Sequence, residues 1–217
     1  MVRTNRYDHF CPVARSLEVI GEKWSLLIVR DLLGGPQRFT DLQRGLANIT
    51  PKWLTMRLRE LEAAGLVVRE QQPGKREAWY RLTPRGEDLR PVVGALNAWG
   101  MRHAIRPPGP GEQMHPSRLA RSFFGYLNTA RVRPPRPLGW RIDFAGDAQD
   151  LWFDGEAWAR RRVEAPALVV HTSMERWVAM LTQEPARRPL EECVELEGEP
   201  AEIARFRETL ATVLQPA

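Results

Sequence analysis

One stretch restricts the fold of this chain more than any other: residues 50–66, TPKWLTMRLRELEAAGL. Thr50 suits a helix N-cap, and Pro51 falls at the first helical position, where a missing backbone N–H costs nothing. Three leucines then recur at helical spacing, and Gly65 stands where a C-terminal cap belongs. The stretch therefore predicts a helix over 51–64 whose single apolar stripe faces a core.

The other side of this helix contains few acidic residues. At about 100° per residue, the positions roughly opposite the leucines are Lys52, Thr55, Met56 and Arg59. A solvated helix face normally mixes acids and bases in pairs, whereas a face that lies in a DNA groove does not. The helix alone leaves both interpretations open, so the surrounding sequence has to decide between them.

The neighbouring segments predict a helix-turn-helix followed by a wing. Further helices are expected at 12–20, at 22–33, and from 84 to about 104. A short helix is expected within 38–46, with Thr40 as its N-cap. The β-rich segments 66–70 and 78–82 flank the loop QQPGKRE, which holds Pro and Gly. Two short helices joined by a tight turn, the second being 51–64, form a helix-turn-helix, and the hairpin after it is a wing.

Composition agrees with a polyanion as the partner of the N-terminal half. The 217 residues have a net charge of +5, but residues 1–106 hold 18 Lys/Arg against 11 Asp/Glu, whereas 107–217 hold 14 against 16. A basic half beside a mildly acidic half indicates that only the first seeks nucleic acid. The chain has neither a long apolar run nor a secretion signal and has only two cysteines, so we expect a cytoplasmic protein.

The N-terminal residues resemble the HxlR family of bacterial winged-helix regulators. The resemblance runs from the Cys-Pro at 11–12 through GEKW at 21–24 and the helix at 51–64 to YRLTPRGEDLRPVVGALNAWG. It implies a homodimeric transcription factor, expected to be a repressor, whose terminal helices help form the dimer. Each subunit would place one recognition helix on one half-site of a pseudo-palindromic operator, and double-stranded DNA would be its partner.

Carried onto this chain, the recognition helix is 51–64 and the wing tip is 73–77. Lys52, Thr55 and Arg59 are expected to face base edges, whereas Arg57, Lys75 and Arg76 are expected to hold phosphates or to enter the minor groove. Arg38 and Thr40 lie where the preceding helix would meet the DNA backbone. Trp53 either shields the helix edge against the wing or contacts a base, and the shielding role is the favoured interpretation.

The C-terminal half predicts a separate α+β domain with an antiparallel sheet. The expected organisation is 1–106 for DNA binding and dimerisation, a Pro-rich linker at 107–116, and 117–217 as the second domain, with helices near 117–131, 173–183 and 200–214. Short β-rich runs separated by glycine-containing turns suggest meandering strands, and no glycine-rich phosphate loop is present.

This half resembles, more loosely, a sterol-carrier-protein type 2-like domain, on the strength of DLWFDG at 150–155, HTSMERWVAML and GEPAEIARF. The resemblance implies an apolar cavity for a hydrophobic effector. The side chains expected to line it are Trp140, Phe144, Trp152, Trp158, Trp177 and Leu181. The same residues are what any small α+β core needs, so a purely structural or dimer-widening domain remains open. A lipid carrier in which DNA binding is incidental is a further alternative.

Cys11 offers a different mode of regulation. Some members of the HxlR family use a cysteine at the corresponding Cys-Pro to sense oxidants or electrophiles, and a helix start with Arg15 nearby would lower the pKa of the thiol. A small buried cysteine is equally common. Catalysis is not expected, because the four histidines show no metal-ligand spacing and Ser173, near His171, is better explained as a helix cap. No cofactor or metal is predicted.

Overall fold

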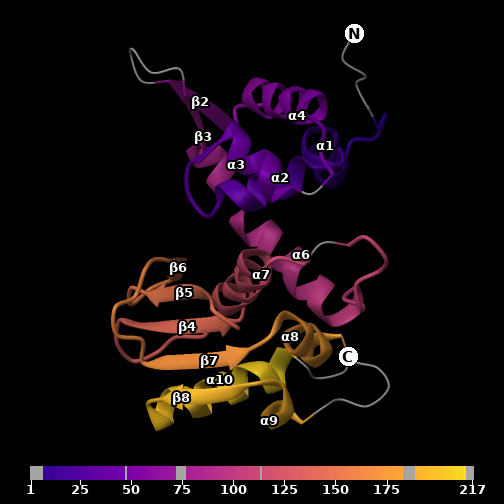
Figure 1. The fold of residues 1–217 in the computed structure, drawn as a ribbon. Coiled ribbons are helices and arrows are strands. Elements are labelled where there is room, and N and C mark those ends of the chain that lie inside the picture. Colours follow the sequence, from indigo (N-terminus) through magenta and orange to yellow (C-terminus); the bar gives the residue numbers. More distant parts are fainter. Residues whose placement is uncertain (1–6, 47, 72–76, 113, 183–188, 214–217) are drawn as a thin grey trace. The chain divides into compact units, whose positions relative to one another are not determined.

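The structure is a computed structural model of the chain, and it describes residues 7–46, 48–71, 77–112, 114–182 and 189–213. The chain divides into two compact units, Met1–Val93 and Gly94–Ala217, whose elements are labelled in Figure 1. Each unit has its own hydrophobic core. The division falls inside a helix, whereas the sequence suggested a linker at 107–116. In that Pro-rich segment Glu112 accepts hydrogen bonds from the Gly109 amide and from Arg106, at 2.7 Å each.

The N-terminal unit is a winged helix-turn-helix, as the sequence predicted. Its elements are α1 (Pro12–Ile20), α2 (Ser25–Leu32), β1 (Gln37–Arg38), α3 (Phe39–Gly45), α4 (Pro51–Ala63), β2 (Val67–Gln71), β3 (Ala78–Leu82), α5 (Pro84–Glu87) and the start of α6 (Arg90–His103). The three strands form an antiparallel sheet in the order β1-β3-β2. The short strand β1 has no signal in the sequence, because two residues are too few to show a period.

Helix α4 follows its sequence signals closely. The Thr50 hydroxyl accepts a hydrogen bond from the Trp53 amide at 3.3 Å, and Pro51 begins the helix. The leucine stripe is buried in the core of the unit, and the helix ends at Ala63, just before Gly65 with its positive φ of 69°. Because glycine adopts this backbone conformation without strain, the chain turns directly into β2.

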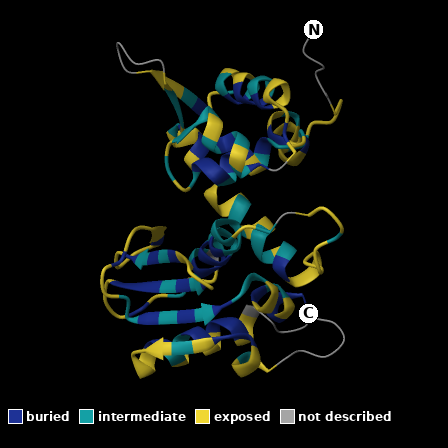
Figure 2. Ribbon diagram, viewed as in Figure 1, coloured by how far each residue is buried: buried dark blue, intermediate teal, exposed yellow. Residues whose placement is uncertain are grey.

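The C-terminal unit is a five-stranded sheet with helices on one face. Its elements are the rest of α6, then α7 (Pro116–Thr129), β4 (Leu138–Phe144), β5 (Asp147–Phe153), β6 (Trp158–Arg160), β7 (Leu168–Thr172), α8 (Met174–Leu181), α9 (Leu190–Cys193), β8 (Glu195–Gly198) and α10 (Pro200–Val213). From Trp140 to Phe144 of β4, buried residues alternate with partly exposed ones (Figure 2). The buried set packs with Phe123 of α7, Trp177 of α8 and Phe206 of α10.

The predicted antiparallel sheet needs one correction. In the strand order β6-β5-β4-β7-β8 all neighbours are antiparallel except β4 and β7, which run parallel, with Trp140 opposite Leu168. The connection from β6 to β7 therefore crosses β5 and β4. It crosses the face without helices, where Val163 covers Gly139 so closely that a methyl group at position 139 would overlap it.

Two charged side chains on that face hold the crossing segment. Arg141 donates to both carboxylate oxygens of Asp150, at 2.7 and 3.0 Å, and also to the Val163 carbonyl at 2.6 Å. Asp150 accepts in turn from the Val163 amide at 2.9 Å. Burial alone would raise the pKa of Asp150, but these hydrogen bonds hold that pKa below its usual value. The Arg141–Asp150 pair is thus a structural clamp.

Candidate nucleic-acid interface

The outer face of α4 presents two cations to solvent. Lys52 and Arg59 are exposed, and neither forms an ion pair with any residue that the structure describes. Between them lie Thr55 and Met56, both half-buried, and the Thr55 hydroxyl donates to the Pro51 carbonyl at 2.8 Å. That bond leaves the hydroxyl oxygen as an acceptor and the methyl group as an apolar contact, two of the groups that read base edges.

Arg57 does not belong to this face, contrary to the expectation that it holds a phosphate. Its side chain is only 7% exposed and pairs with Glu22 at 3.2 Å and with Glu60. Its guanidinium also lies 5.8 Å from the centre of the Trp53 ring. Trp53 itself is half exposed, on the edge of the helix. Because both carboxylates already occupy the guanidinium, Arg57 is part of the packing of α4.

Arg38 is the N-cap residue of α3, so Thr40 is not the N-cap that the sequence suggested. Thr40 is exposed in the first turn, whereas Arg38 is half-buried and forms a two-pronged ion pair with Glu77, at 3.0 Å for each prong. The Arg38 guanidinium also stacks over Trp79 of β3, 4.8 Å from the ring centre. Arg38 therefore joins the start of α3 to the start of β3, and a phosphate would have to compete with Glu77 for its guanidinium.

The described part of the wing adds a cation that the sequence analysis missed. Arg69 of β2 is exposed and lies directly opposite Tyr80 of β3. Burial raises the pKa of Tyr80, while Arg69 and Arg59 act in the opposite direction, so both cations lie near this hydroxyl. Arg69 lies beside Tyr80 because of the register of the hairpin, which is seen in the structure. Lys75 and Arg76, predicted at the wing tip, fall outside the described residues.

Cys11 is the N-cap residue of α1 and is half exposed, and it forms no disulfide with Cys193, which is buried. The nearby cation is already paired, because Arg15 donates to both oxygens of Glu18 at 3.1 Å.

Ser173 caps α8 as predicted, accepting from the Arg176 amide at 3.2 Å. Within the described ranges no group of three or more His, Cys, Asp or Glu residues is arranged to hold a metal ion.

The aromatic residues predicted to line a cavity mostly fill the core of the C-terminal unit. Trp140, Phe144, Trp158, Trp177 and Leu181 are buried, with the Trp140 and Trp158 rings 4.6 Å apart. Trp152 lies on the other face of the sheet, where Arg161 stacks on it at 5.5 Å. Their side chains pack against one another or on the sheet surface, and none of the six lines a pocket found among α8, α9, β8 and α10.

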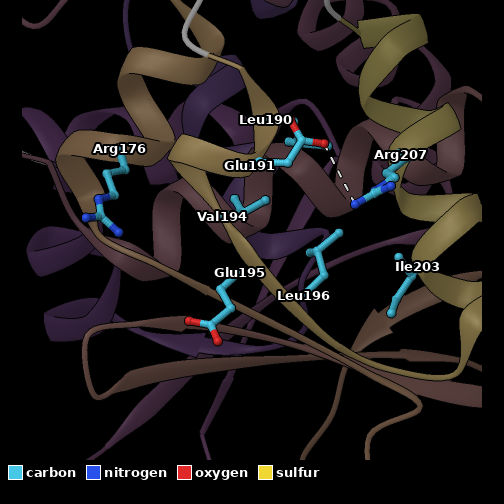
Figure 3. Close-up of a pocket in the computed structure, with 8 residues that line it drawn as sticks. All are labelled: Arg176, Leu190, Glu191, Val194, Glu195, Leu196, Ile203 and Arg207. Carbon is cyan, nitrogen blue, oxygen red and sulfur yellow. Dashed lines mark ion pairs between the residues drawn. The ribbon is translucent and has the colours of Figure 1, made fainter.

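That pocket, of about 410 Å³, lies among α8, α9, β8 and α10 (Figure 3). Its apolar lining is Leu190, Val194, Leu196 and Ile203, and its charged lining is Arg176, Glu191, Glu195 and Arg207. Figure 3 shows Arg207 directed toward Glu191, 3.8 Å away, a separation too long for a hydrogen bond.

Across the described part of the chain, no helix is both long and apolar enough to span a bilayer.

The chain is similar in sequence to known helix-turn-helix regulators. Residues 19–107 match the HxlR-like helix-turn-helix family. Over 105 residues the chain is 43% identical to the uncharacterized HTH-type transcriptional regulator YkvN of Bacillus subtilis. The aligned region covers 47% of this chain and 87% of YkvN. The chain belongs to the HxlR-like family. It is accordingly a DNA-binding transcriptional regulator, and the family match ends at residue 107.

A second relative of this family extends further. The uncharacterized HTH-type transcriptional regulator Rv3095 of Mycobacterium tuberculosis is 39% identical over 137 residues, which cover 58% of this chain and 84% of Rv3095. Among solved structures, the reduced form of the transcriptional regulator YodB from B. subtilis is 32% identical, with 47% of this chain and 100% of that chain covered and a TM-score of 0.40.

Proposed function

We propose that this HxlR-like protein is a homodimeric repressor that reads a pseudo-palindromic operator with α4 of each subunit. The observation that carries the proposal is the outer face of α4, where Lys52 and Arg59 are exposed without carboxylate partners among the described residues. A recognition helix that reads the major groove needs cations and hydrogen-bonding groups free of such partners. The base-edge contacts are assigned to Lys52, Thr55 and Arg59.

Contacts to phosphate are assigned to residues on both sides of this helix. Thr40 and Arg38 lie at the start of α3, and Arg69 projects from the wing beside Tyr80. Lys75 and Arg76 keep the phosphate or minor-groove role predicted for them. Phosphate contacts set affinity and its salt dependence, whereas base contacts set the sequence that is bound. Arg57 is left out of the interface because it is buried.

Exposed apolar side chains support the dimer. Phe10, just before α1, is fully exposed, and Val13 and Leu17 of α1 are also exposed. On α6, the exposed residues Val92, Leu96 and Trp99 follow one another at helical spacing. Apolar stripes of this kind on a water-facing surface mark contacts with another chain. Sedimentation of the wild type should give a dimer, and Val13→Glu should weaken it; a monomeric wild type would contradict this part of the proposal.

The test of DNA reading is a fluorescence anisotropy titration against DNA from upstream of the protein's own gene and against scrambled DNA, at several salt concentrations. We expect tighter binding to the upstream DNA, with a steep salt dependence for both. Equal affinity for the two would contradict an operator at this place. Scanning a library of random double-stranded oligonucleotides then separates an operator located elsewhere from a protein without sequence preference.

A hydrophobic small molecule is proposed as the effector, and the supporting observation is the half-apolar pocket among α8, α9, β8 and α10. Its volume falls within the range of small-molecule sites, roughly 300–1,000 Å³. Repeating the titration after an extraction that removes hydrophobic molecules tests this. A changed operator affinity supports an effector, and tight ligand binding without any preferred DNA favours the lipid-carrier alternative.

The alternative through Cys11 rests on its half-exposed thiol at the start of α1. Oxidation there would alter the chain beside Phe10 and Val13, the apolar residues assigned to the dimer contact. Mass spectrometry after mild peroxide treatment of the folded protein is the direct test. A modified Cys11 together with lower operator affinity supports the thiol switch, and an unmodified thiol rejects it.

A further inference from the structure

The buried guanidinium of Arg57 is an unusual feature for a helix that lies on a protein surface. A charge removed from water is costly unless carboxylates and hydrogen bonds compensate it. Here the two nitrogens at the end of the side chain contact Glu22 and Glu60, while its Nε has no hydrogen-bond partner in the described structure. The position of this side chain therefore depends on those two carboxylates.

The two carboxylates differ in what they can fix. Glu60 belongs to α4 itself, three residues from Arg57, so this pair moves together with the helix. Glu22 lies 35 residues away, in the turn between α1 and α2. Within the described residues it is the one ion-pair partner of Arg57 that belongs to a different element. The Glu22–Arg57 contact of 3.2 Å is thus the charged link between that turn and the recognition helix.

The leucine stripe cannot replace this link. Apolar packing holds α4 against the core, but it is non-directional and tolerates small rotations about the helix axis. A charge-assisted hydrogen bond is directional. At a surface radius of about 5–6 Å, a rotation of roughly 20° moves a helix side chain by about 2 Å, enough to lose a hydrogen bond to a base. Arg57 lies two residues from both Thr55 and Arg59, so its orientation sets theirs.

The turn that carries Glu22 is itself held in a specific shape. Trp24 has a φ of 82°, in the left-handed region that residues other than glycine rarely adopt. The Glu22 carbonyl accepts from the Ser25 amide at 3.0 Å, which starts α2 immediately afterwards. A strained residue persists where the surrounding structure determines its conformation. The carboxylate of Glu22 is therefore presented to α4 from a well-defined position at the end of α1.

We propose that Glu22 is a positioning residue for DNA reading, which fixes the rotation of α4 through Arg57 and so fixes which side chains meet the bases. The inference rests on the proposed function of α4 as the base-reading helix. Because the turn follows α1 directly, the same link transmits a displacement of α1 to the reading face. Glu22 contacts no DNA in this role.

The test compares Glu22→Gln with Glu18→Gln. Both variants remove one negative charge from neighbouring positions, but Glu18 pairs with Arg15 on α1 and not with Arg57. We expect Glu22→Gln to lower the ratio of operator affinity to scrambled-DNA affinity roughly tenfold, the loss typical of one misplaced base contact. Glu18→Gln should leave that ratio unchanged. An unchanged ratio in folded Glu22→Gln protein would overturn the proposal.

Two further variants keep the proposal testable. Glu22→Asp retains the charge and should restore part of the ratio, and it serves in place of Glu22→Gln if the latter does not fold. Arg57→Lys loses the forked geometry, and combining it with Glu22→Gln should lower the ratio no further than the larger single effect. Fully additive losses would show that the two side chains act independently and would overturn the proposal.

A measurement without DNA separates this inference from the proposed function. If the wild type shows no preferred DNA at all, base reading by α4 fails, yet the link can still be examined. Residual dipolar couplings of backbone amides in the full-length protein report the orientation of α4 relative to α2. We expect the orientation of α4 to differ from the wild type in Glu22→Gln and to be unchanged in Glu18→Gln. The same orientation in both variants would overturn the positioning role whatever the DNA data show.

Discussion

Three arginines on or near the helix-turn-helix have three different environments. Arg59 is exposed without an ion pair in the described structure, Arg57 is buried between two carboxylates, and Arg38 is held by Glu77. Only the first is free to meet a base without giving up a partner. The second would have to give up its contacts with Glu22 and Glu60, and the third would have to release Glu77 before it binds a phosphate. Equal charge therefore does not mean an equal role in binding.

Arg59→Ala should reduce sequence discrimination more than overall affinity. Losing a contact with a base edge costs roughly 1–3 kcal/mol of operator preference. The matched control is Arg85→Ala, because Arg85 is also exposed but hydrogen-bonds the Ala64 carbonyl at 3.0 Å. Anisotropy titrations of both variants on operator and scrambled DNA give the two ratios. Loss of affinity for both DNAs to the same degree would place Arg59 on a phosphate.

Glu77→Gln should increase binding to any DNA. With its carboxylate partner removed, Arg38 no longer has to leave an anion before it meets a phosphate. Exposed pairs contribute at most about 1 kcal/mol, so we expect a rise of roughly two- to fivefold in affinity for scrambled DNA. The double variant Arg38→Gln/Glu77→Gln should lose this gain. A gain that survives in the double variant would trace the effect to overall charge.

The sequence predicted the exposed face of α4, which is proposed to read DNA, but not the contacts of each cation on this helix. Helical spacing places Lys52 and Arg59 on the side opposite the leucines, and the structure agrees. Helical spacing cannot show that Glu22, from a distant turn, forms an ion pair with Arg57, because periodicity carries no information on contacts between elements. Arg69 was missed for a related reason: its position opposite Tyr80 depends on the register of the hairpin.

At the scale of elements, the parallel pair of β4 and β7 is what the sequence did not predict. Each strand shows its own β-forming residues, and neighbouring strands joined by short turns are normally antiparallel. Residues 161–163, which follow β6, are not a further strand but belong to the crossing connection. Gly139 makes that crossing possible, and a single glycine in a strand gives no indication of which segment covers it.

Gly139→Ala should therefore destabilise the C-terminal unit. The added methyl group overlaps Val163, and overpacking of this kind costs about 1–3 kcal/mol of unfolding free energy. Gly100→Ala is the control, since a methyl group there meets nothing within 4 Å and should stabilise α6 by about 0.5–1 kcal/mol. Urea unfolding measures both. Adding Val163→Ala to Gly139→Ala should recover part of the loss, and no recovery would contradict the overlap.

At the scale of the whole chain, α6 contributes residues to both units. Val93 packs against the core of the N-terminal unit, whereas Met101 is part of the core of the C-terminal one. Asn97 also donates to the Ser122 carbonyl at 2.9 Å. The Pro-rich composition of 107–116 drew the predicted boundary to that segment, because proline content reports on local stiffness and not on which core a preceding helix joins.

Two fragments distinguish these boundaries. Fragment 94–217 keeps Met101 and Asn97, whereas fragment 107–217 lacks both. Burying one methionine side chain is worth about 1.5–3 kcal/mol, so fragment 94–217 should unfold at a higher urea concentration. Circular dichroism during urea titration measures the two midpoints. Equal midpoints would place the boundary in the Pro-rich segment, as the sequence suggested.

The order of strands along the chain also determines when each unit can be completed during synthesis. The N-terminal unit ends at Val93, whereas the sheet of the C-terminal unit needs β7 beside β4 and Phe206 of α10 against its core. That residue leaves the ribosome more than 100 residues later, roughly 6–20 s at ~5–20 residues per second. A nascent chain thus carries a finished helix-turn-helix before the unit proposed to bind the effector exists.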